Sequence, residues 1–359
     1  MKKFFSYICV FLLVFTMVGC KKNKKLQNIN EFKINSAIKT VEAYMNSYMS
    51  NDTSAMNRMY SKGLKKKAQS VNTHYLKVSS YKVINTREMG TTADIEVNVV
   101  SADEHSPYTS VDDYTFKIKK DKGKYVIDKI DSSLDKEVFQ YKRNLMVKIK
   151  DEAKSNILIN LRGIPEYAFS KKDDLKVDKL RVSKDTFSYL TLSNFGDTVI
   201  ISTAGPNPFV GICQITDLEE QESGGQNGSQ NQSDQSLEDE SQPFKVAAKS
   251  LSPVDVYKDS QIVNMIFSKS DDMVAVQYNQ NATMHIQVYD AGAGKVLSKS
   301  IDKKFPQDKF DLKLVRFDDK YLIFESAAKD NYKDDAEVKK NVGKWEWNLK
   351  SYKITKYKD

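Results

Sequence analysis

The pattern that most restricts the fold is the strict alternation of apolar and polar residues that begins after residue 80. In 93–99, Ala, Ile and Val alternate with Asp, Glu and Asn. This period of two is typical of a strand with one buried and one solvated face. Residues 114–118 repeat it, and the charged turn 119–124 leads into a further alternating run, 125–130. Two such runs joined by a turn that contains Gly predict an antiparallel hairpin.

The segment before these strands has helical periodicity instead. Its apolar residues are three or four positions apart, which predicts an amphipathic helix: Ile34, Ile38, Val41, Met45 and Tyr48. Asp52 is a suitable N-cap for a second, short helix that carries Met56, Met59 and Tyr60. The order of helices followed by antiparallel strands predicts an α+β unit over residues 34–133.

This unit resembles the NTF2-like fold, in which helices are cupped in a curved antiparallel sheet. The resemblance is carried by residues 44–52 at the end of the helical stripe and by the terminal hairpin with 123–130. It implies a conical pocket, which Tyr44, Tyr48 and Tyr60 would line. The same three rings lie on stripes that must be buried in any case, so core packing is the favoured interpretation. No catalytic motif of NTF2-like enzymes is matched, and no catalytic residue is carried over.

The first twenty residues have the pattern of an export signal. Lys2 and Lys3 precede an uncharged, mostly apolar run, 4–18, which is shorter than the ~20 residues of a membrane-spanning helix. The run ends in Met17-Val18-Gly19-Cys20, which resembles the signal of bacterial lipoproteins. That resemblance implies cleavage after Gly19, diacylglycerol on the Cys20 thiol, and a location at the outer face of the cytoplasmic membrane. The alternatives are an uncleaved anchor and an ordinary secretory signal.

Lysines dominate the positive charge, with 50 Lys and only six Arg. Lys21, Lys22, Lys24 and Lys25 lie in the predicted tether 20–33, where each lysine near an anionic surface contributes about 1 kcal/mol to membrane binding. A second cluster, at 62–67, would face anionic lipid or wall polymer, although such a run is usually a solvated helix face. Export and the shortage of Arg argue against nucleic acid as a partner.

The remainder of the chain divides into three parts. Residues 134–155 have apolar residues on one helical face and predict a connecting helix. Residues 156–359 are β-rich. Within them, 219–243 contains seven acidic residues and no aromatic or basic residue, which predicts a disordered acidic insertion.

An apparent repeat occurs in the β-rich part. Residues 192–201 align with 267–276, and 317–324 forms a shortened third copy; in each, a turn with Asp precedes an apolar strand. The first two copies start 75 residues apart, or 50 without the 25-residue insertion, and the third starts 50 residues after the second. Repeats of about 50 residues resemble β-propeller blades, although propellers have 4–8 blades and only three copies fit. Residues 169–175 match the second copy better but are out of phase. The prediction is therefore an all-β, blade-like domain, either propeller-like or an open sandwich.

No motif for catalysis, cofactor binding or metal binding was found. The three histidines are far apart, and the alternation around His285 predicts a solvent-facing side chain. Cys213 lies in an apolar run and is expected to be a small core residue. Trp345 and Trp347 share one strand face with Leu349, which favours a core over a carbohydrate-binding surface.

The leading hypothesis is a lipid-anchored, exported protein without enzymatic activity that binds a protein or cell-wall polymer. The alternative is an envelope enzyme or small-ligand receptor that uses the NTF2-like pocket. A pocket filled by Tyr44, Tyr48 and Met45 would exclude that alternative.

Overall fold

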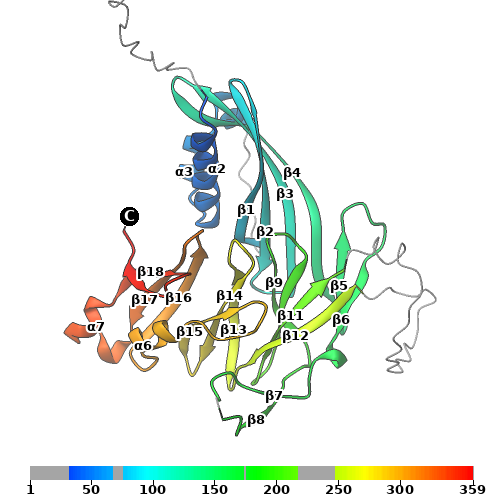
Figure 1. Cartoon of the computed structure of the whole chain (residues 1–359), viewed down its shortest axis with the longest axis vertical. Coiled ribbons are helices and arrows are strands. Elements are labelled where there is room, and N and C mark those ends of the chain that lie inside the picture. The colour runs from blue at the N-terminus through cyan, green and yellow to red at the C-terminus, as the bar shows by residue number, and fades with distance from the viewer. Residues whose placement is uncertain (1–31, 68–75, 174, 217–246, 359) are drawn as a thin grey trace, which may run out of the picture.

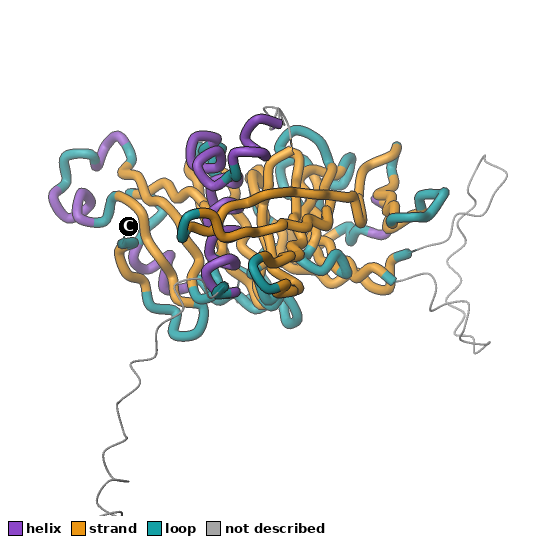
Figure 2. Tube along the Cα trace, turned by 90° about the horizontal axis from the view of Figure 1, so that it is seen from above, coloured by secondary structure: helices purple, strands orange, loops and turns teal. Residues whose placement is uncertain are grey.

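The computed structural model describes residues 32–67, 76–173, 175–216 and 247–358, and these are mostly strand with short helices (Figures 1 and 2). The helices are α2 (Ile34–Met49), α3 (Thr53–Met59), α4 (Lys62–Lys67), α6 (Lys299–Lys304) and α7 (Ala336–Lys340), with short 3-10 turns at Leu161–Gly163 and Asp330–Tyr332. No helix in these ranges combines the length and the apolar character that a membrane span requires.

Six consecutive strands form one long antiparallel sheet: β1 (Leu76–Met89), β2 (Thr92–Asp103), β3 (Tyr108–Asp121), β4 (Lys124–Tyr141), β5 (Asn144–Ile149) and β6 (Asn156–Asn160). The predicted hairpin is confirmed, since β3 pairs with β4 and Asp121 lies opposite Lys124. Its two turn residues, Lys122 and Gly123, have φ values of 49° and 82°. Positive φ at both central residues is what the type I′ turn of a two-residue hairpin requires.

The prediction of an NTF2-like α+β domain is wrong. The first four strands have 12 to 18 residues, and α2 covers only one end of the sheet they form (Figure 1). Towards the other end, β9 lies against β2 and β3. One hydrophobic cluster therefore joins Val111 and Val138 of the long sheet to Leu190 of β9. Because the sheet shares this core with the strands that follow, it is part of a mostly β structure and not an independent α+β unit.

The connecting helix predicted over 134–155 is also wrong. The segment contains the end of β4 and all of β5. The predicted apolar stripe would include Tyr141, but this residue is 51% exposed, and Lys142 has φ 54° in the turn between the two strands. Val138 and Leu145 are both buried, but they face the core from two paired strands.

The β-rich part forms three antiparallel sheets of consecutive strands, which we call the first, second and third blade sheets. The first is β9 (Phe187–Leu192), β10 (Thr198–Thr203), β11 (Phe209–Ile215) and β12 (Ala248–Val256); the second is β13 (Ser260–Phe267), β14 (Met273–Gln280) and β15 (Thr283–Asp290); the third is β16 (Phe310–Phe317), β17 (Tyr321–Ala328), β18 (Gly343–Asn348) and β19 (Ile354–Lys356). They follow one another along the lower part of Figure 1. Two short strands, β7 (Tyr167–Phe169) and β8 (Lys179–Arg181), pair with each other beside them. The prediction of a blade-like β region is confirmed.

The blade sheets are held by apolar and aromatic side chains. Trp345 and Trp347 are 5% and 0% exposed, so the prediction that they face a core is confirmed. Cys213 is fully buried in the first blade sheet, and burial raises the pKa of its thiol to about 12. A thiol with that pKa stays protonated at neutral pH and is not a nucleophile.

Candidate functional site

The residues predicted to anchor the protein lie outside the described ranges. These are Cys20 and the tether lysines Lys21, Lys22, Lys24 and Lys25. Lipidation and membrane contact therefore remain predictions from the sequence.

The three tyrosines that the resemblance placed around a pocket are part of a hydrophobic core. Tyr44 is 6% exposed, its hydroxyl lies 2.9 Å from that of Tyr60, and its ring centroid lies 5.4 Å from that of Phe116. Tyr48 packs against the same cluster, and Met45 is fully buried beneath it. Burial raises the pKa of Tyr44 above its ordinary value. The space that the alternative hypothesis needed for a ligand is thus filled by side chains.

The sequence repeat corresponds to a repeated turn with the same hydrogen bonds. In the first blade sheet, the Ser193 hydroxyl donates to Asp197 Oδ1 (2.8 Å) and accepts from the Thr198 amide (3.1 Å). In the second, the Ser268 hydroxyl donates to Asp272 Oδ1 (2.7 Å) and accepts from the Met273 amide (3.1 Å). The two turns, 75 positions apart, are therefore copies of one structure.

The third copy retains only the aspartate. Asp318 donates its amide to the Tyr321 carbonyl (2.8 Å) and binds the Arg316 guanidinium through both carboxylate oxygens (2.8 and 3.0 Å). The shortened turn thus uses a side-chain ion pair where the other two use a serine.

The turns of the first and second blade sheets meet the long sheet at a polar cluster, which we call the junction. Its centre is Asn194, which is fully buried. The Asn194 side-chain amide donates to Asp271 Oδ1 (2.6 Å) and to the Ser268 carbonyl (2.9 Å), and its Oδ1 accepts from the Ser80 hydroxyl (2.9 Å). The Asn98 side-chain amide donates to the Asn194 carbonyl (2.9 Å), and the Asn194 backbone amide donates to Asp271 Oδ1 (3.0 Å). One residue thus joins β1, β2 and two blade sheets.

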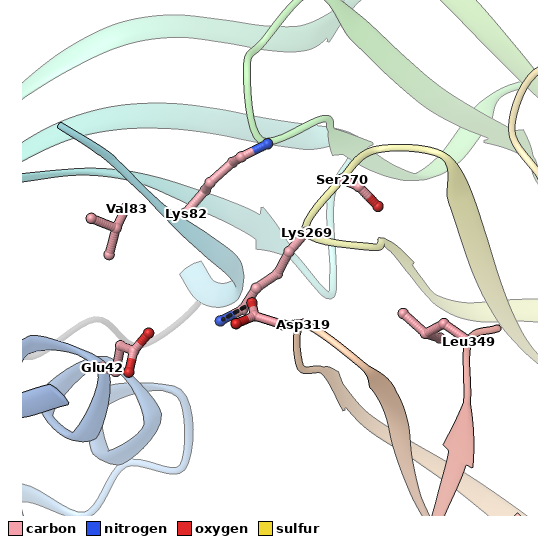
Figure 3. Close-up of a pocket in the computed structure, with 7 residues that line it drawn as sticks. All are labelled: Glu42, Lys82, Val83, Lys269, Ser270, Asp319 and Leu349. Carbon is pink, nitrogen blue, oxygen red and sulfur yellow. Dashed lines mark ion pairs between the residues drawn. The ribbon is translucent and has the colours of Figure 1, made fainter. Parts of the chain in front are cut away.

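A cleft of about 400 Å³ opens beside the junction (Figure 3). It is lined from α2, from β1, from the turn of the second blade sheet and from the third blade sheet: Glu42, Lys82, Val83, Lys269, Ser270, Asp319 and Leu349. Lys269 crosses it, because its ammonium lies 3.4 Å from Asp319 Oδ1 and 4.4 Å from the Tyr81 ring centroid. The cleft therefore contains an ion pair that already joins two blade sheets.

The carboxylates next to this cleft have opposite environments. Burial raises the pKa of Asp271, and its Oδ2 has no hydrogen-bond partner within the described part of the chain. Burial would also raise the pKa of Asp272, but hydrogen bonds from Ser270 and Ser268 lower it below its ordinary value. Both residues have local structural roles in the turn, so we assign the cleft a structural rather than a ligand-binding role.

A second cavity, of about 350 Å³, has a different character. It lies between the β7–β8 connection and the second blade sheet, and we call it the Lys172 cavity. Its lining combines aromatic, aliphatic and polar groups: Lys172, Val177, Leu180, Tyr257, Tyr278 and Gln287. The Lys172 ammonium donates to the Tyr278 hydroxyl (2.6 Å) and lies 5.3 Å from that ring's centroid. Lys172 is exposed overall, but partial loss of hydration around its ammonium lowers its pKa.

A buried chain of hydrogen bonds supports the wall of this cavity. The Tyr289 hydroxyl donates to Asp255 Oδ2 (2.6 Å), so the Tyr257 hydroxyl, 2.6 Å away, donates to Tyr289. Asp255 Oδ1 accepts from the amides of Lys171 (2.8 Å) and Val256 (2.7 Å). Burial raises the pKa of Asp255. The chain fixes Tyr257 and holds the β7–β8 connection against the second blade sheet.

One polar group at the cavity is left without a protein partner. Gln287 is 3% exposed, and its Oε1 has no hydrogen bond from any residue that the structure describes. An unpaired buried acceptor costs about 1–3 kcal/mol. Gln287 lines the Lys172 cavity but its Oε1 is itself covered, so a bound donor would pair with this oxygen only after the side chain turns towards the cavity.

His285 lies near the same wall, and the prediction that it faces solvent is wrong. It is 5% exposed, with its ring centroid 5.1 Å from that of Tyr278. Burial and the neighbouring Lys172 lower its pKa to about 4, so the imidazole is neutral at pH 7. Other chain segments cover the face of β15 that carries His285. The alternation of residues within one strand does not reveal that both of its faces are buried.

Sequence reasoning missed the Lys172 cavity because its residues come from distant segments. The only signal was the out-of-phase repeat copy at 169–175. In the structure it is no blade turn, since Phe169 ends β7 and Lys171 and Lys172 contact Asp255 and Tyr278. Within the described ranges, no group of three or more His, Cys, Asp or Glu residues is placed to hold a metal ion.

Comparison with known proteins gives no family. No family model and no curated protein matches the sequence. Among solved structures, the chain is similar to TolB from Acinetobacter baumannii (8% identity, TM-score 0.30, covering 76% of this chain and 55% of TolB) and to the β-propeller domain of Cps50 (Swd1) from Myceliophteria thermophila (9% identity, TM-score 0.24, covering 64% of this chain and 76% of that domain). The chain thus spans about half the length of TolB. At these scores we transfer neither fold detail nor function from them.

Proposed function

We propose that this protein is an exported, lipid-anchored binding protein of the bacterial envelope, without enzymatic activity, and that the Lys172 cavity and its rim receive a partner protein. The anchor rests on the sequence 17–20, in which Gly19 precedes a cysteine at the end of a short apolar run. Diacylglycerol on Cys20 holds the chain at the outer face of the cytoplasmic membrane, where the tether lysines contact anionic lipid.

The observation that supports binding is an exposed apolar rim beside an unpaired acceptor. Leu175 and Val177, on the β7–β8 connection, are 85% and 74% exposed. Val177 and Gln287 both line the cavity, and the buried Gln287 Oε1 behind its surface lacks a donor among the described residues. Contiguous exposed apolar patches mark interaction surfaces, whereas single scattered apolar residues are normal on a protein surface. A protein supplies both an apolar side chain for the rim and N–H or O–H donors for Gln287.

Photo-crosslinking in intact cells tests this proposal. A photoreactive amino acid at Val177 is expected to capture a discrete partner, whereas the same residue at Val342, a 36% exposed site just before β18, is expected to capture none. Equal capture at both positions, or no capture at Val177, would contradict the assignment of the surface.

The anchor has its own test. Cys20→Ala is expected to move the protein from the detergent phase to the aqueous phase in a Triton X-114 partition. A variant that stays in the detergent phase shows that the protein is held by something other than a lipid on Cys20.

The cavity volume favours a second candidate, a small-ligand receptor at the same place. About 350 Å³ is within the range of roughly 300–1,000 Å³ that ligand pockets occupy. Native mass spectrometry of protein isolated from its own membranes distinguishes the two: a bound small mass that is absent from Gln287→Met favours the receptor.

A further inference from the structure

The end of the molecule at which the described chain begins carries a dense positive charge. All four lysines of α4 are exposed, and they are Lys62, Lys65, Lys66 and Lys67. The tip of the β3–β4 hairpin, residues 117–129, adds six lysines and only two aspartates. These 19 residues have a net charge of +8, which equals the net charge of all 359 residues. We call them the basic end.

Tertiary structure brings the two segments together. Tyr60, just before α4, forms a parallel bridge with Ile127 of β4, and the Ser61 amide donates to the Ile127 carbonyl (2.8 Å). One of the two aspartates is paired within this surface, because Asp128 Oδ1 lies 2.5 Å from the Lys119 ammonium, whose hydrogen bond lowers the pKa of Asp128. The lysines of α4 and of the hairpin tip therefore form one surface.

The predicted anchor leads directly to this surface. The Phe32 ring packs edge-on against Tyr125 at the hairpin (5.0 Å between centroids), and the Lys33 amide donates to the Tyr125 hydroxyl (2.6 Å). Even fully extended, the twelve residues from Cys20 to Phe32 span at most about 43 Å. A lipid on Cys20 thus keeps the basic end within that distance of the bilayer.

We propose that the basic end is a second membrane contact, which binds anionic lipid headgroups and orients the anchored protein. This rests on the proposed lipid anchor for its biological setting. The two acyl chains of a diacylglycerol already anchor the protein stably, so the contribution of the basic end is to orient the protein on the bilayer. Figure 1 shows the β3–β4 hairpin at the opposite end of the molecule from β7 and β8. With the basic end on the bilayer, the Lys172 cavity faces away from the membrane, towards the wall and its proteins.

Vesicle sedimentation tests the proposal without the lipid. The mature chain from residue 20, with Cys20→Ser, is expected to bind vesicles of phosphatidylcholine with 30% phosphatidylglycerol. It is expected not to bind vesicles of pure phosphatidylcholine. Replacement of the four lysines of α4 by Gln is expected to weaken binding by at least about tenfold. The matched control replaces four exposed lysines around the third blade sheet by Gln and removes the same charge: Lys333, Lys339, Lys340 and Lys350.

Each possible result of this experiment either supports or overturns the proposal. Loss of binding in the α4 variant alone supports the proposal, whereas equal binding by the two variants overturns it in favour of net charge. Binding to soluble polyglycerol phosphate but not to anionic vesicles overturns it in favour of wall polymer. Because the test protein carries no lipid, a failure here leaves the Cys20→Ala partition to judge the anchor separately.

Discussion

Two buried amide side chains, Asn194 at the junction and Gln287 at the Lys172 cavity, illustrate how differently this protein treats polar groups. Asn194 is fully buried, and its backbone and side-chain groups donate to or accept from Ser80, Asn98, Ser268 and Asp271. Gln287 is 3% exposed, and its Oε1 has no partner. The first amide holds three sheets together, and the second contributes nothing to the fold through its oxygen.

The two amides differ in what they contribute to the free energy of folding, and this difference distinguishes a structural role from a binding role. The hydrogen bonds of Asn194 stabilise one arrangement of the three sheets, although Asn98 Oδ1 and Asp271 Oδ2 at the same junction lack partners among the described residues. An unpaired acceptor destabilises the folded state by about 1–3 kcal/mol, and Gln287 has no such network in the described part of the chain to offset that cost. A residue that costs stability in the free protein is a good candidate for a binding role. We therefore expect mutations at the junction to change stability and mutations at the cavity to change binding.

Asn194→Ala is expected to have the largest effect on stability. It removes three side-chain hydrogen bonds and leaves the half-buried Asp271 without its side-chain donor, so the free energy of unfolding should fall by about 3 kcal/mol. Chemical denaturation measures this loss. The control is the adjacent Phe195→Ala, whose ring is 52% exposed and should cost less than about 1 kcal/mol. A loss no larger than the control's would show that the junction does not join the sheets.

His285 tests whether the cavity wall is buried in solution. Its pKa of about 4 is below the ordinary 6.5, so between these values the unfolded chain binds a proton that the folded chain does not. Stability should therefore fall as the pH drops from 6.5 to 4, by on the order of 2 kcal/mol, and His285→Gln should abolish this part of the slope. Unfolding midpoints across this pH range measure it, with the loop variant His105→Gln as control. An unchanged slope in His285→Gln would contradict the burial of the wall.

Local patterns explain what the sequence predicted correctly. The β3–β4 hairpin depends on alternation and on Lys122-Gly123, all within about twenty residues. The repeat around Ser193 and Ser268 is equally local, because each turn makes its own hydrogen bonds. The rest depends on contacts that local patterns do not contain.

Long-range contacts explain what was missed. Asn194 meets Asp271 across 77 positions, and Lys172 meets Tyr278 across 106, so neither the junction nor the cavity leaves a spacing signal. The NTF2-like resemblance failed for a related reason, since it described helices and a hairpin but not the strands that continue past α2 to meet β9. His285 alternates correctly, yet packing from elsewhere buries its face.

The repeated turn provides a smaller and paired test. Ser193→Ala and Ser268→Ala each leave one backbone amide without its acceptor and should each reduce the free energy of unfolding by about 1 kcal/mol. Because the two turns have the same hydrogen bonds, the two losses should agree within about 0.5 kcal/mol. Denaturation of the two single variants checks this. Clearly unequal losses would show that the two turns do not have the same hydrogen bonds in solution.

The smallest stability effect is expected at Gln287, where the comparison is sharpest. Gln277 and Gln287 are buried glutamines on paired strands of the second blade sheet, but Gln277 Oε1 accepts from the Leu314 amide (2.9 Å). Gln277→Met should therefore cost about 1 kcal/mol, whereas Gln287→Met should change the free energy of unfolding by less than about 0.5 kcal/mol or raise it. Capture by the photo-crosslinker at Val177 should fall in Gln287→Met and persist in Gln277→Met. If instead Gln287→Met destabilises the protein and leaves capture intact, the unpaired oxygen is structural, and the distinction between junction and cavity fails.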